Sequence, residues 1–245
     1  MTAIKTIHLT KRYKHTTAVD DLTLEIHQGE LFSILGINGA GKTTTIKMLT
    51  GLTKPTCGDA YIGGYSIATQ SEQAKQLIGV SPQETAVAPN LSVEENLALI
   101  CGIYGFSKEK TKAKVAELTA QFSLESVLTR KAGKLSGGWQ RRVSIAMALI
   151  SEPHILFLDE PTLGLDVIAR HELWNLIRGM KGRVTILLTT HYMEEATALS
   201  DRIGIMANGS LLAVGTVEAL KERAEADDFE TAFISIVREA SVCAR

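Results

Sequence analysis

The chain of 245 residues is long enough for one domain with a hydrophobic core, or at most for two small ones. Hydrophobic residues make up 45% of it and charged residues 22%, as in ordinary folded domains, which argues against disorder, collagen and coiled coil. Its 26 basic and 27 acidic side chains leave a formal charge of -1, without the positive excess typical of proteins that bind a phosphate backbone. Nucleic acid is therefore not an expected partner.

Cysteine spacing and hydropathy indicate the redox compartment of the chain and its relation to membranes. Its three cysteines lie far apart without a Cys-x-x-Cys pair, which predicts neither a disulfide framework nor a zinc site and favours a reducing compartment. Residues 1–17 mix apolar with basic side chains, so we expect no signal peptide there. The most apolar stretches, 97–106 and 143–150, are shorter than the roughly 18 residues that cross a bilayer. A role at a membrane would therefore need another, membrane-spanning chain.

The first third of the chain predicts a strand, a glycine turn and a helix in that order. Residues 22–26 alternate apolar with polar side chains, the pattern of a half-buried strand, and residues 31–35 predict a short buried strand. A helix is expected over 44–49 after the glycine-rich turn. Residues 58–65, with two glycines in the middle, predict a hairpin or an irregular pair of strands.

The middle of the chain is expected to form a helical lobe over residues 84–150. Ser92 and Glu95 have the spacing of a capping box, which predicts that a helix begins there. A second, charged amphipathic helix is expected over 108–118. This lobe interrupts two parts of the chain that are rich in predicted strands.

The last part alternates strands with a helix. The expected elements are a strand at 155–158, a helix at 167–180, and strands at 184–190, 203–207 and 211–214. Asn208 and Gly209 form a two-residue hairpin signal between the last two strands. Strands that alternate with helices form parallel sheets covered on both faces, so the predicted fold class is α/β with a mostly parallel sheet.

One run of residues has the pattern of a phosphate-binding loop. Residues 36–43 match G-x-x-x-x-G-K-[ST], in which glycines let successive backbone N-H groups converge on phosphate oxygens. Lys42 would reach the terminal phosphates, and the Thr43 hydroxyl would ligate Mg²⁺. The run lies between a predicted strand and a predicted helix, the context that the motif requires, whereas an ordinary glycine turn would not need this setting.

Two acidic residues follow the predicted strand at 155–158. Ligands of open α/β sheets collect at the carboxyl ends of the strands, where Asp159 and Glu160 are expected. Asp159 would hold the magnesium, and Glu160 would orient and deprotonate a water that attacks the terminal phosphate. Alone, two acids after a strand more often form a turn or a helix cap; paired with the phosphate loop, they favour catalysis.

A second candidate anion site lies at Ser136, Gly137 and Gly138. Ser136 is placed to cap a helix, which would be a purely structural role. The hydroxyl and the N-H groups of the two glycines at a helix start would equally bind a phosphate. A chain with two phosphate cradles needs a reason for the second one.

Four motifs in their order and spacing resemble the ATP-binding subunits of ATP-binding cassette transporters. They are the phosphate loop, LSGGWQRR, FLDEPTLGLD and the TTHYMEEA that contains His191. The resemblance covers residues 4–234 and leaves 235–245 as a tail. It implies a P-loop NTPase core with an N-terminal antiparallel β subdomain and an inserted helical lobe. TTHYMEEA and the segment 228–233 look more like the export branch than like importers.

The resemblance also implies roles for single residues. Tyr13 resembles the aromatic residue that stacks on adenine, Gln83 the glutamine that senses magnesium and water, and His191 the histidine that contacts the terminal phosphate. The implied catalytic residues are Lys42, Glu160 and His191, and the implied magnesium ligands are Thr43, Gln83 and Asp159. The implied ATP-binding residues are Tyr13, Asn38, Gly39, Ala40, Gly41, Lys42, Thr43, Thr44, Gln83, Ser136, Gly137, Gly138 and Asp166.

The resemblance implies partners as well. Two cassettes, expected to be identical, would meet head to tail, so that ATP on the Lys42 face of one is completed by Ser136 of the other. A separate membrane-spanning permease would be driven by ATP hydrolysis, with this chain peripheral on the cytoplasmic face of the cell membrane. The alternative is a soluble cassette ATPase that acts as an assembly scaffold, as in iron-sulfur biogenesis. The sequence does not identify a transported substance.

Overall fold

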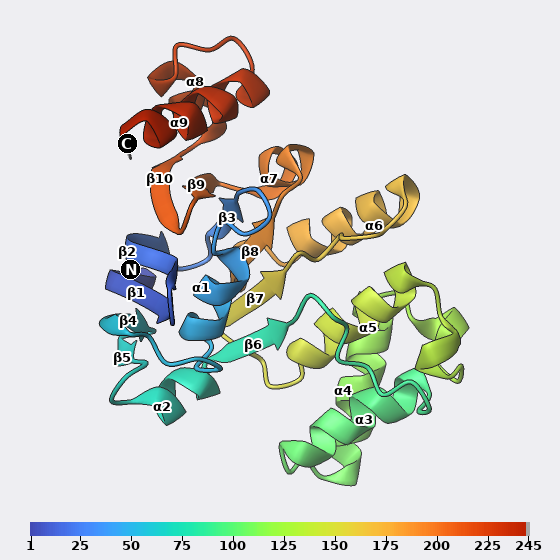
Figure 1. The fold of residues 1–245 in the computed structure, drawn as a ribbon. Helices are drawn as coiled ribbons and strands as arrows, with labels where there is room; N and C mark the ends of the chain where they lie inside the picture. Colours follow the sequence, from blue (N-terminus) through green and yellow to red (C-terminus); the bar gives the residue numbers. More distant parts are fainter. Residues whose placement is uncertain (244–245) are drawn as a thin grey trace.

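The computed structural model describes residues 1–243, and its centre is a six-stranded sheet (Figure 1). The strand order is β10-β9-β3-β8-β7-β6. The strands are β3 (Leu31–Leu35), β6 (Ile78–Ser81), β7 (Ile155–Asp159), β8 (Thr185–Thr190), β9 (Arg202–Ala207) and β10 (Ser210–Gly215). All neighbouring pairs are parallel except β9 with β10. The prediction of a mostly parallel sheet is therefore confirmed.

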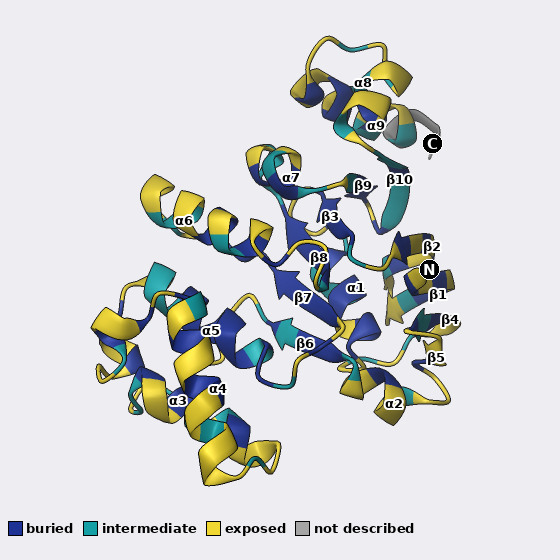
Figure 2. Cartoon of the chain, turned by 180° about the vertical axis from the view of Figure 1, so that it is seen from behind, coloured by how far each residue is buried: buried dark blue, intermediate teal, exposed yellow. Residues whose placement is uncertain are grey.

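The inner strands of this sheet have no solvent-facing side. Every residue of β3, β7 and β8 is buried, as expected for a parallel sheet with helices on both faces (Figure 2). The register places Asp159 of β7 opposite Thr189 of β8, and Leu35 of β3 opposite Thr190. These strands therefore end together, and the residues that follow them meet at one edge.

A smaller antiparallel sheet packs across α1 (Lys42–Leu49) from the large one. Its order is β2-β1-β4-β5, with β1 (Thr2–Tyr13), β2 (Thr16–His27), β4 (Cys57–Ile62) and β5 (Tyr65–Ser66). Ile46 and Met48 of α1 share a hydrophobic cluster with Ile4 of β1 and Phe157 of β7. The expected antiparallel β subdomain is confirmed. Sequence reasoning assigned no strand to residues 2–13, because bulges interrupt the alternation of β1.

Residues 84–150 contain α3 (Val93–Ile103), α4 (Lys108–Gln121) and α5 (Gly137–Ala148), which lie to one side of the sheet (Figure 1). The capping box is confirmed: Ser92 Oγ accepts from Glu95 N, and Glu95 accepts from Ser92 N. The helices enclose a hydrophobic cluster that continues to Leu156 and Leu188 of the sheet. We call this segment the helical lobe.

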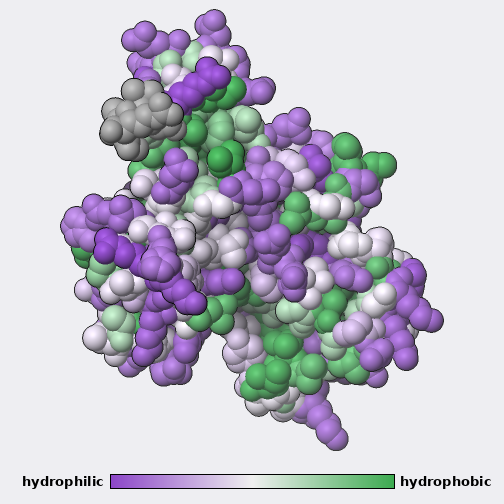
Figure 3. All heavy atoms as spheres, viewed as in Figure 1, coloured by the Kyte–Doolittle hydropathy of each residue, from purple (hydrophilic) through white to green (hydrophobic). Residues whose placement is uncertain are grey.

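The helical lobe exposes hydrophobic side chains at the end of α3. Ile103 is 71% exposed, and Leu99 and Tyr104 lie nearby on the same surface segment. Figure 3 shows hydrophobic residues gathered on the lobe, at the foot of that view. Larger exposed patches of this kind mark interaction sites.

Helices that the sequence reasoning did not assign complete the fold. They are α2 (Ser71–Gln76), α7 (Met193–Leu199), α8 (Val217–Arg223) and α9 (Phe229–Cys243). The last two pack on β9 and β10 at the end of the molecule far from the helical lobe (Figures 1 and 2). Asn208 and Gly209 both have positive φ, as the predicted hairpin turn requires. The division between a cassette at 4–234 and a tail at 235–245 stays a prediction, and residues 244–245 lie outside the described chain.

Candidate active site

The turn between β3 and α1 can adopt its shape because it contains glycine at two crowded positions. A Cβ on Gly36 would lie 2.2 Å from the carbonyl oxygen of Met206, and one on Gly41 would lie 2.4 Å from that of Ala18. Gly41 also has a φ of 106° and is the N-cap of α1. The glycine leaves the first backbone N-H groups of α1 facing the turn, where the helix dipole favours an anion.

Lys42 holds its ammonium group over this turn. Lys42 Nζ donates to Gly36 O at 2.7 Å and to Ile37 O at 3.2 Å. It also forms an ion pair with Glu160 Oε1 at 3.1 Å, and both side chains are buried. A cation placed at the mouth of a glycine-rich turn can bind the outer phosphates of a nucleotide.

Asp159 and Thr43 form a small set of oxygen donors. Thr43 Oγ1 donates to Asp159 Oδ1 at 3.2 Å, and Asp159 Oδ1 also accepts from Thr189 Oγ1 at 2.5 Å. Mg²⁺ binds through one or two protein oxygens and completes its shell with phosphates and water. Within residues 1–243 no group of three or more His, Cys, Asp and Glu side chains could hold a metal by itself. The donor set therefore fits magnesium bound together with a nucleotide.

Glu160 projects from the end of β7 toward His191 at the end of β8. His191 Nδ1 lies 2.6 Å from Glu160 Oε2, while the other carboxylate oxygen pairs with Lys42. The Glu160 backbone adopts a left-handed φ of 48°. Its N-H donates to Thr189 O and to Thr189 Oγ1, both at 3.1 Å. The backbone of Glu160 is thus fixed by Thr189, and its buried carboxylate lines the cavity.

These residues line one cavity of about 450 Å³. Its lining residues are Thr16, Thr17, Ala18, Asn38, Gly39, Ala40, Gly41, Lys42, Thr43, Thr44, Gln83, Glu160, Leu163 and His191. The structure thus brings together the predicted phosphate loop, the candidate base, the histidine and Gln83. Asp159 adjoins them through its hydrogen bond with Thr43. The roles of these residues stay predictions, but their convergence is a property of the fold.

Gln83 is held at the cavity through its backbone by a residue of the helical lobe. Arg141 of α5 donates from one guanidinium nitrogen to Pro82 O and from another to Gln83 O, each at 2.6 Å. Burial lowers the pKa of the Arg141 guanidinium, while Asp159 and Glu195 raise it. An arginine nevertheless keeps its charge in proteins. Its bonds join α5 to the segment that carries Gln83.

Some predicted residues lie elsewhere. Tyr13 ends β1, is 45% exposed, and has Lys11 Nζ 4.9 Å from its ring centroid. Ser136 is the N-cap of α5, and a Cβ added to Gly138 would lie 3.1 Å from that of Ala169. Asp166 is the N-cap of α6 (Val167–Arg178), where its carboxylate accepts from Ala169 N at 2.9 Å. The second phosphate cradle therefore lies beside the start of α6 and does not line the cavity of Lys42.

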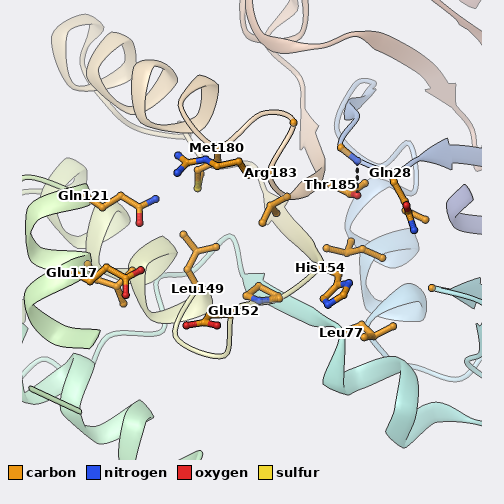
Figure 4. Close-up of a pocket in the computed structure, with 18 of the residues that line it drawn as sticks. Gln28, Leu77, Glu117, Gln121, Leu149, Glu152, His154, Met180, Arg183 and Thr185 are labelled. Carbon is orange, nitrogen blue, oxygen red and sulfur yellow. Dashed lines mark hydrogen bonds between the residues drawn. The ribbon is translucent and has the colours of Figure 1, made fainter. Parts of the chain in front are cut away.

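A larger cavity, of about 840 Å³, lies at the other ends of the strands (Figure 4). It is lined by Glu117 and Gln121 of α4 and by His154 and Thr185 at the start of β7 and β8. None of the predicted site residues, all of which the structure describes, belongs to it. Size alone does not identify the active site here.

Sequence reasoning missed two residues that hold the site together. Thr189 contacts both Asp159 and Glu160, and Arg141 holds the segment at Gln83. The pair of threonines before His191 was visible as the end of a strand, but only the parallel pairing of β7 with β8 puts Thr189 beside the acids. Arg141 lies within the LSGGWQRR run, and nothing in its spacing indicates a partner near residue 83.

The protein-family model for the ABC transporter family matches residues 19–163, more than half of the chain. The chain belongs to the ABC transporter family. The fold confirms this assignment, because it has the cassette architecture expected from the motifs. Within residues 1–243 no helix combines the length and the hydrophobicity needed to cross a bilayer.

Relatives of this ABC cassette include transport proteins of different lengths. The phospholipid-transporting ATPase ABCA3 of Homo sapiens is 42% identical over 224 residues, which are 90% of this chain and 13% of ABCA3. The doxorubicin resistance ATP-binding protein DrrA of Mycobacterium tuberculosis is 43% identical over 208 residues, 84% of this chain and 63% of DrrA. The Nod factor export ATP-binding protein I of Burkholderia orbicola is 42% identical over 213 residues, which are 86% of this chain and 70% of that protein. This cassette thus spans less than two thirds of ABCA3 and of DrrA.

Solved structures of cassettes superpose on this chain. An ATP-binding subunit of an ABC transporter has a TM-score of 0.84 at 29% identity, covering 96% of this chain and 99% of that one. A dimeric post-hydrolysis cassette bound to ADP and Pi has a TM-score of 0.78 at 28% identity, covering 87% and 98%. The second structure shows that a cassette of this fold binds nucleotide as a dimer.

Proposed function

We propose that this chain binds and hydrolyses ATP and thereby drives a separate membrane permease. The observation that carries the proposal is the placement of Glu160, whose buried carboxylate faces the cavity between Lys42 and His191. A carboxylate held next to a phosphate-binding loop can accept a proton from an attacking water. The shared fold and the name of the ADP- and Pi-bound relative support hydrolysis of a nucleotide.

The chain's own residues would act as follows. The backbone N-H groups of residues 38–44 bind the phosphates, and Lys42 moves its charge from Glu160 to the terminal phosphate. Thr43 and Asp159 would hold Mg²⁺, with Gln83 at the same cavity, and the ion when bound would neutralise phosphate charge. Glu160 takes the proton of the attacking water, and His191 keeps that carboxylate in place.

The active unit would be a head-to-tail homodimer. Ser136, Gly137 and Gly138 start α5 beside the loop that precedes α6, away from the cavity of their own chain. In the dimer these donors would complete the site of the partner subunit and stabilise charge on the transferred phosphoryl group. Hydrolysis would remove the phosphate contact that favours the closed state. Tyr13 would stack on adenine.

The second partner would be a membrane-spanning permease. The exposed hydrophobic residues at the end of α3 are a surface for such a partner. The chain would then work on the cytoplasmic face of the membrane as a peripheral subunit. Export is supported by the names of the relatives, which refer to drug resistance and to Nod factor export. The iron-sulfur scaffold alternative gains no support from these relatives.

Two measurements test this function. The purified chain should release phosphate from ATP only with Mg²⁺, and after mild detergent extraction it should co-purify with a multi-spanning membrane protein. Absence of Mg²⁺-dependent ATPase activity would exclude the enzymatic role. Co-purification with soluble proteins alone would favour the scaffold alternative.

A further inference from the structure

A buried carboxyl group that no step above uses lies behind the catalytic residues. Glu195 is in the first turn of α7, four positions after His191, and its exposed fraction is 0%. A buried carboxylate needs a cation or several hydrogen bonds to remain charged. Among the described residues no basic side chain forms an ion pair with Glu195, and its Oε2 atom has no hydrogen-bond partner.

The Glu195 carboxyl joins segments that belong to different parts of the site. Trp174 Nε1 of α6 donates to Glu195 Oε1 at 3.1 Å, and the indole is itself buried. Thr190, at the end of β8, and Thr162, in the loop before α6, are polar neighbours that lower the pKa of the same carboxyl. The Thr162 hydroxyl, like Glu195 Oε2, is buried and has no hydrogen-bond partner.

Burial and the neighbouring charge of Glu160 favour the neutral form of Glu195. Burial raises the pKa of the Glu195 carboxyl, and repulsion by Glu160 raises it further, although the polar groups of Thr190, Thr162 and Trp174 lower it. The positive charge of Arg141 of α5 also interacts with Glu195 and favours its ionised form, but the guanidinium already donates to two backbone carbonyls. An ionised Glu195 would place a second buried negative charge near the carboxylate that is to accept a proton.

We propose that Glu195 is a positioning residue whose protonated carboxyl group ties α6 and the loop before it to the segment that carries His191. As an acid it accepts from Trp174 through Oε1, and its Oε2 hydroxyl would donate to the unpartnered hydroxyl of Thr162. The loop at 161–166 and the segment that carries His191 are then held in one arrangement. This inference rests on the proposed ATPase function for its kinetic test but not for its spectroscopic test.

The kinetic consequence is a loss of turnover without a loss of nucleotide binding. Glu195 does not line the cavity, and the phosphate loop is on another element. Glu195→Leu removes both hydrogen-bonding oxygens and should lower kcat about tenfold, with KM for ATP within about twofold of wild type. Glu195→Gln keeps an acceptor and a donor without charge and should restore most of kcat. A merely space-filling role would be served by leucine equally well.

Trp174→Phe is a second variant that keeps an aromatic ring and removes only the donor to Glu195. It should lower kcat several-fold, and adding it to Glu195→Leu should cause little further loss, because both changes remove the same bond. This variant tests the inference even when Glu195→Leu does not fold. Wild-type kcat in Trp174→Phe, or in a folded Glu195→Leu, would overturn the proposal. Glu195→Gln as slow as Glu195→Leu would show that an ionised carboxylate is needed, which would also overturn it.

The protonation state has a direct readout. The infrared difference spectrum between wild type and Glu195→Gln at neutral pH should contain the C=O stretching band of one protonated carboxylic acid. A difference spectrum with only carboxylate bands would contradict the proposal. If the wild-type chain hydrolyses no ATP, the proposed function fails, and this spectrum still decides the state of Glu195.

Discussion

Glu160 and His191 are joined side chain to side chain, with His191 Nδ1 2.6 Å from Glu160 Oε2. The two residues directly follow β7 and β8, which are neighbours in the sheet and end in register. The contact is therefore set by strand pairing, although 31 positions separate the residues. Since the second Glu160 oxygen pairs with Lys42, the carboxylate is fixed from both sides.

Replacing Glu160 by glutamine should separate binding from hydrolysis. Glu160→Gln keeps the shape of the side chain but removes the proton acceptor, so ATP turnover should fall on the order of 10²- to 10⁴-fold. ATP binding should persist, and an ATP-bound dimer should accumulate in size-exclusion chromatography. Glu72→Gln, on the exposed surface of α2, is the matched control. Wild-type turnover in Glu160→Gln would remove Glu160 from its role.

The shared-site model predicts complementation between two inactive chains. Ser136→Ala removes a group that would act on the partner subunit, whereas Lys42→Ala disables the chain's own phosphate loop. In a mixed dimer one site carries both changes and the other carries neither, so activity should rise above that of either parent. Phosphate release is measured as the two variants are mixed in different ratios. A mixture that never exceeds its parents would contradict the model.

Thr189 should affect the metal requirement rather than the binding of nucleotide. Its hydroxyl donates to Asp159 Oδ1 at 2.5 Å and accepts from Glu160 N, so it orients both acids. Thr189→Val removes the hydroxyl at nearly constant volume and should raise the Mg²⁺ concentration for half-maximal ATPase activity about tenfold. Thr197→Val, on the exposed side of α7, should leave it unchanged. Equal Mg²⁺ requirements in the two variants would show that Thr189 does not orient the metal ligand.

Arg141 should contribute to stability through its two bonds to backbone carbonyls. Arg141→Ala leaves Pro82 O and Gln83 O without their charged donor, and such bonds contribute about 2 kcal/mol each. Denaturant unfolding should show a loss of at least about 2 kcal/mol in the free energy of unfolding. Arg238→Ala, at an exposed position of α9, serves as the control. Equal stabilities of the two variants would mean that water replaces the guanidinium.

The capping box at the start of α3 offers a prediction on stability alone. Ser92→Ala removes the acceptor for Glu95 N and should lower the free energy of unfolding by about 1 kcal/mol. ATPase activity at low temperature should be unchanged, because Ser92 lies outside the cavity. Unchanged thermal and denaturant midpoints in Ser92→Ala would show that the cap does not stabilise the fold, because water then binds Glu95 N equally well.

The parts of the site that the sequence predicts are formed by residues that are consecutive in the chain. Residues 36–43 carry the loop, its lysine and its threonine together, and Asp159 and Glu160 end an apolar run. In both cases the backbone itself brings the groups to the carboxyl edge of the sheet. Asn208 and Gly209 were readable for a similar reason, since a two-residue turn depends on its own φ angles.

The parts that were missed depend on pairing between distant segments. β6 has only four residues and no clear alternation, and it becomes a strand because β7 pairs with it in parallel. Thr189 acquires its partners through the register of β8, and Arg141 through the packing of α5 against β6. From the sequence alone, Glu195 is expected to be an ionised surface residue. Its burial in α7 against Trp174 of α6 is what indicates a neutral carboxyl group.

The central claim is that one ATP site is built from two chains, and the dependence of turnover on concentration tests it most directly. Phosphate release per chain should be measured with the wild-type cassette over a wide dilution series at saturating Mg²⁺ and ATP. The two-chain site predicts that the rate per chain falls steeply on dilution, as dimers dissociate. A rate per chain that stays constant down to concentrations at which only monomer is detected would contradict the account.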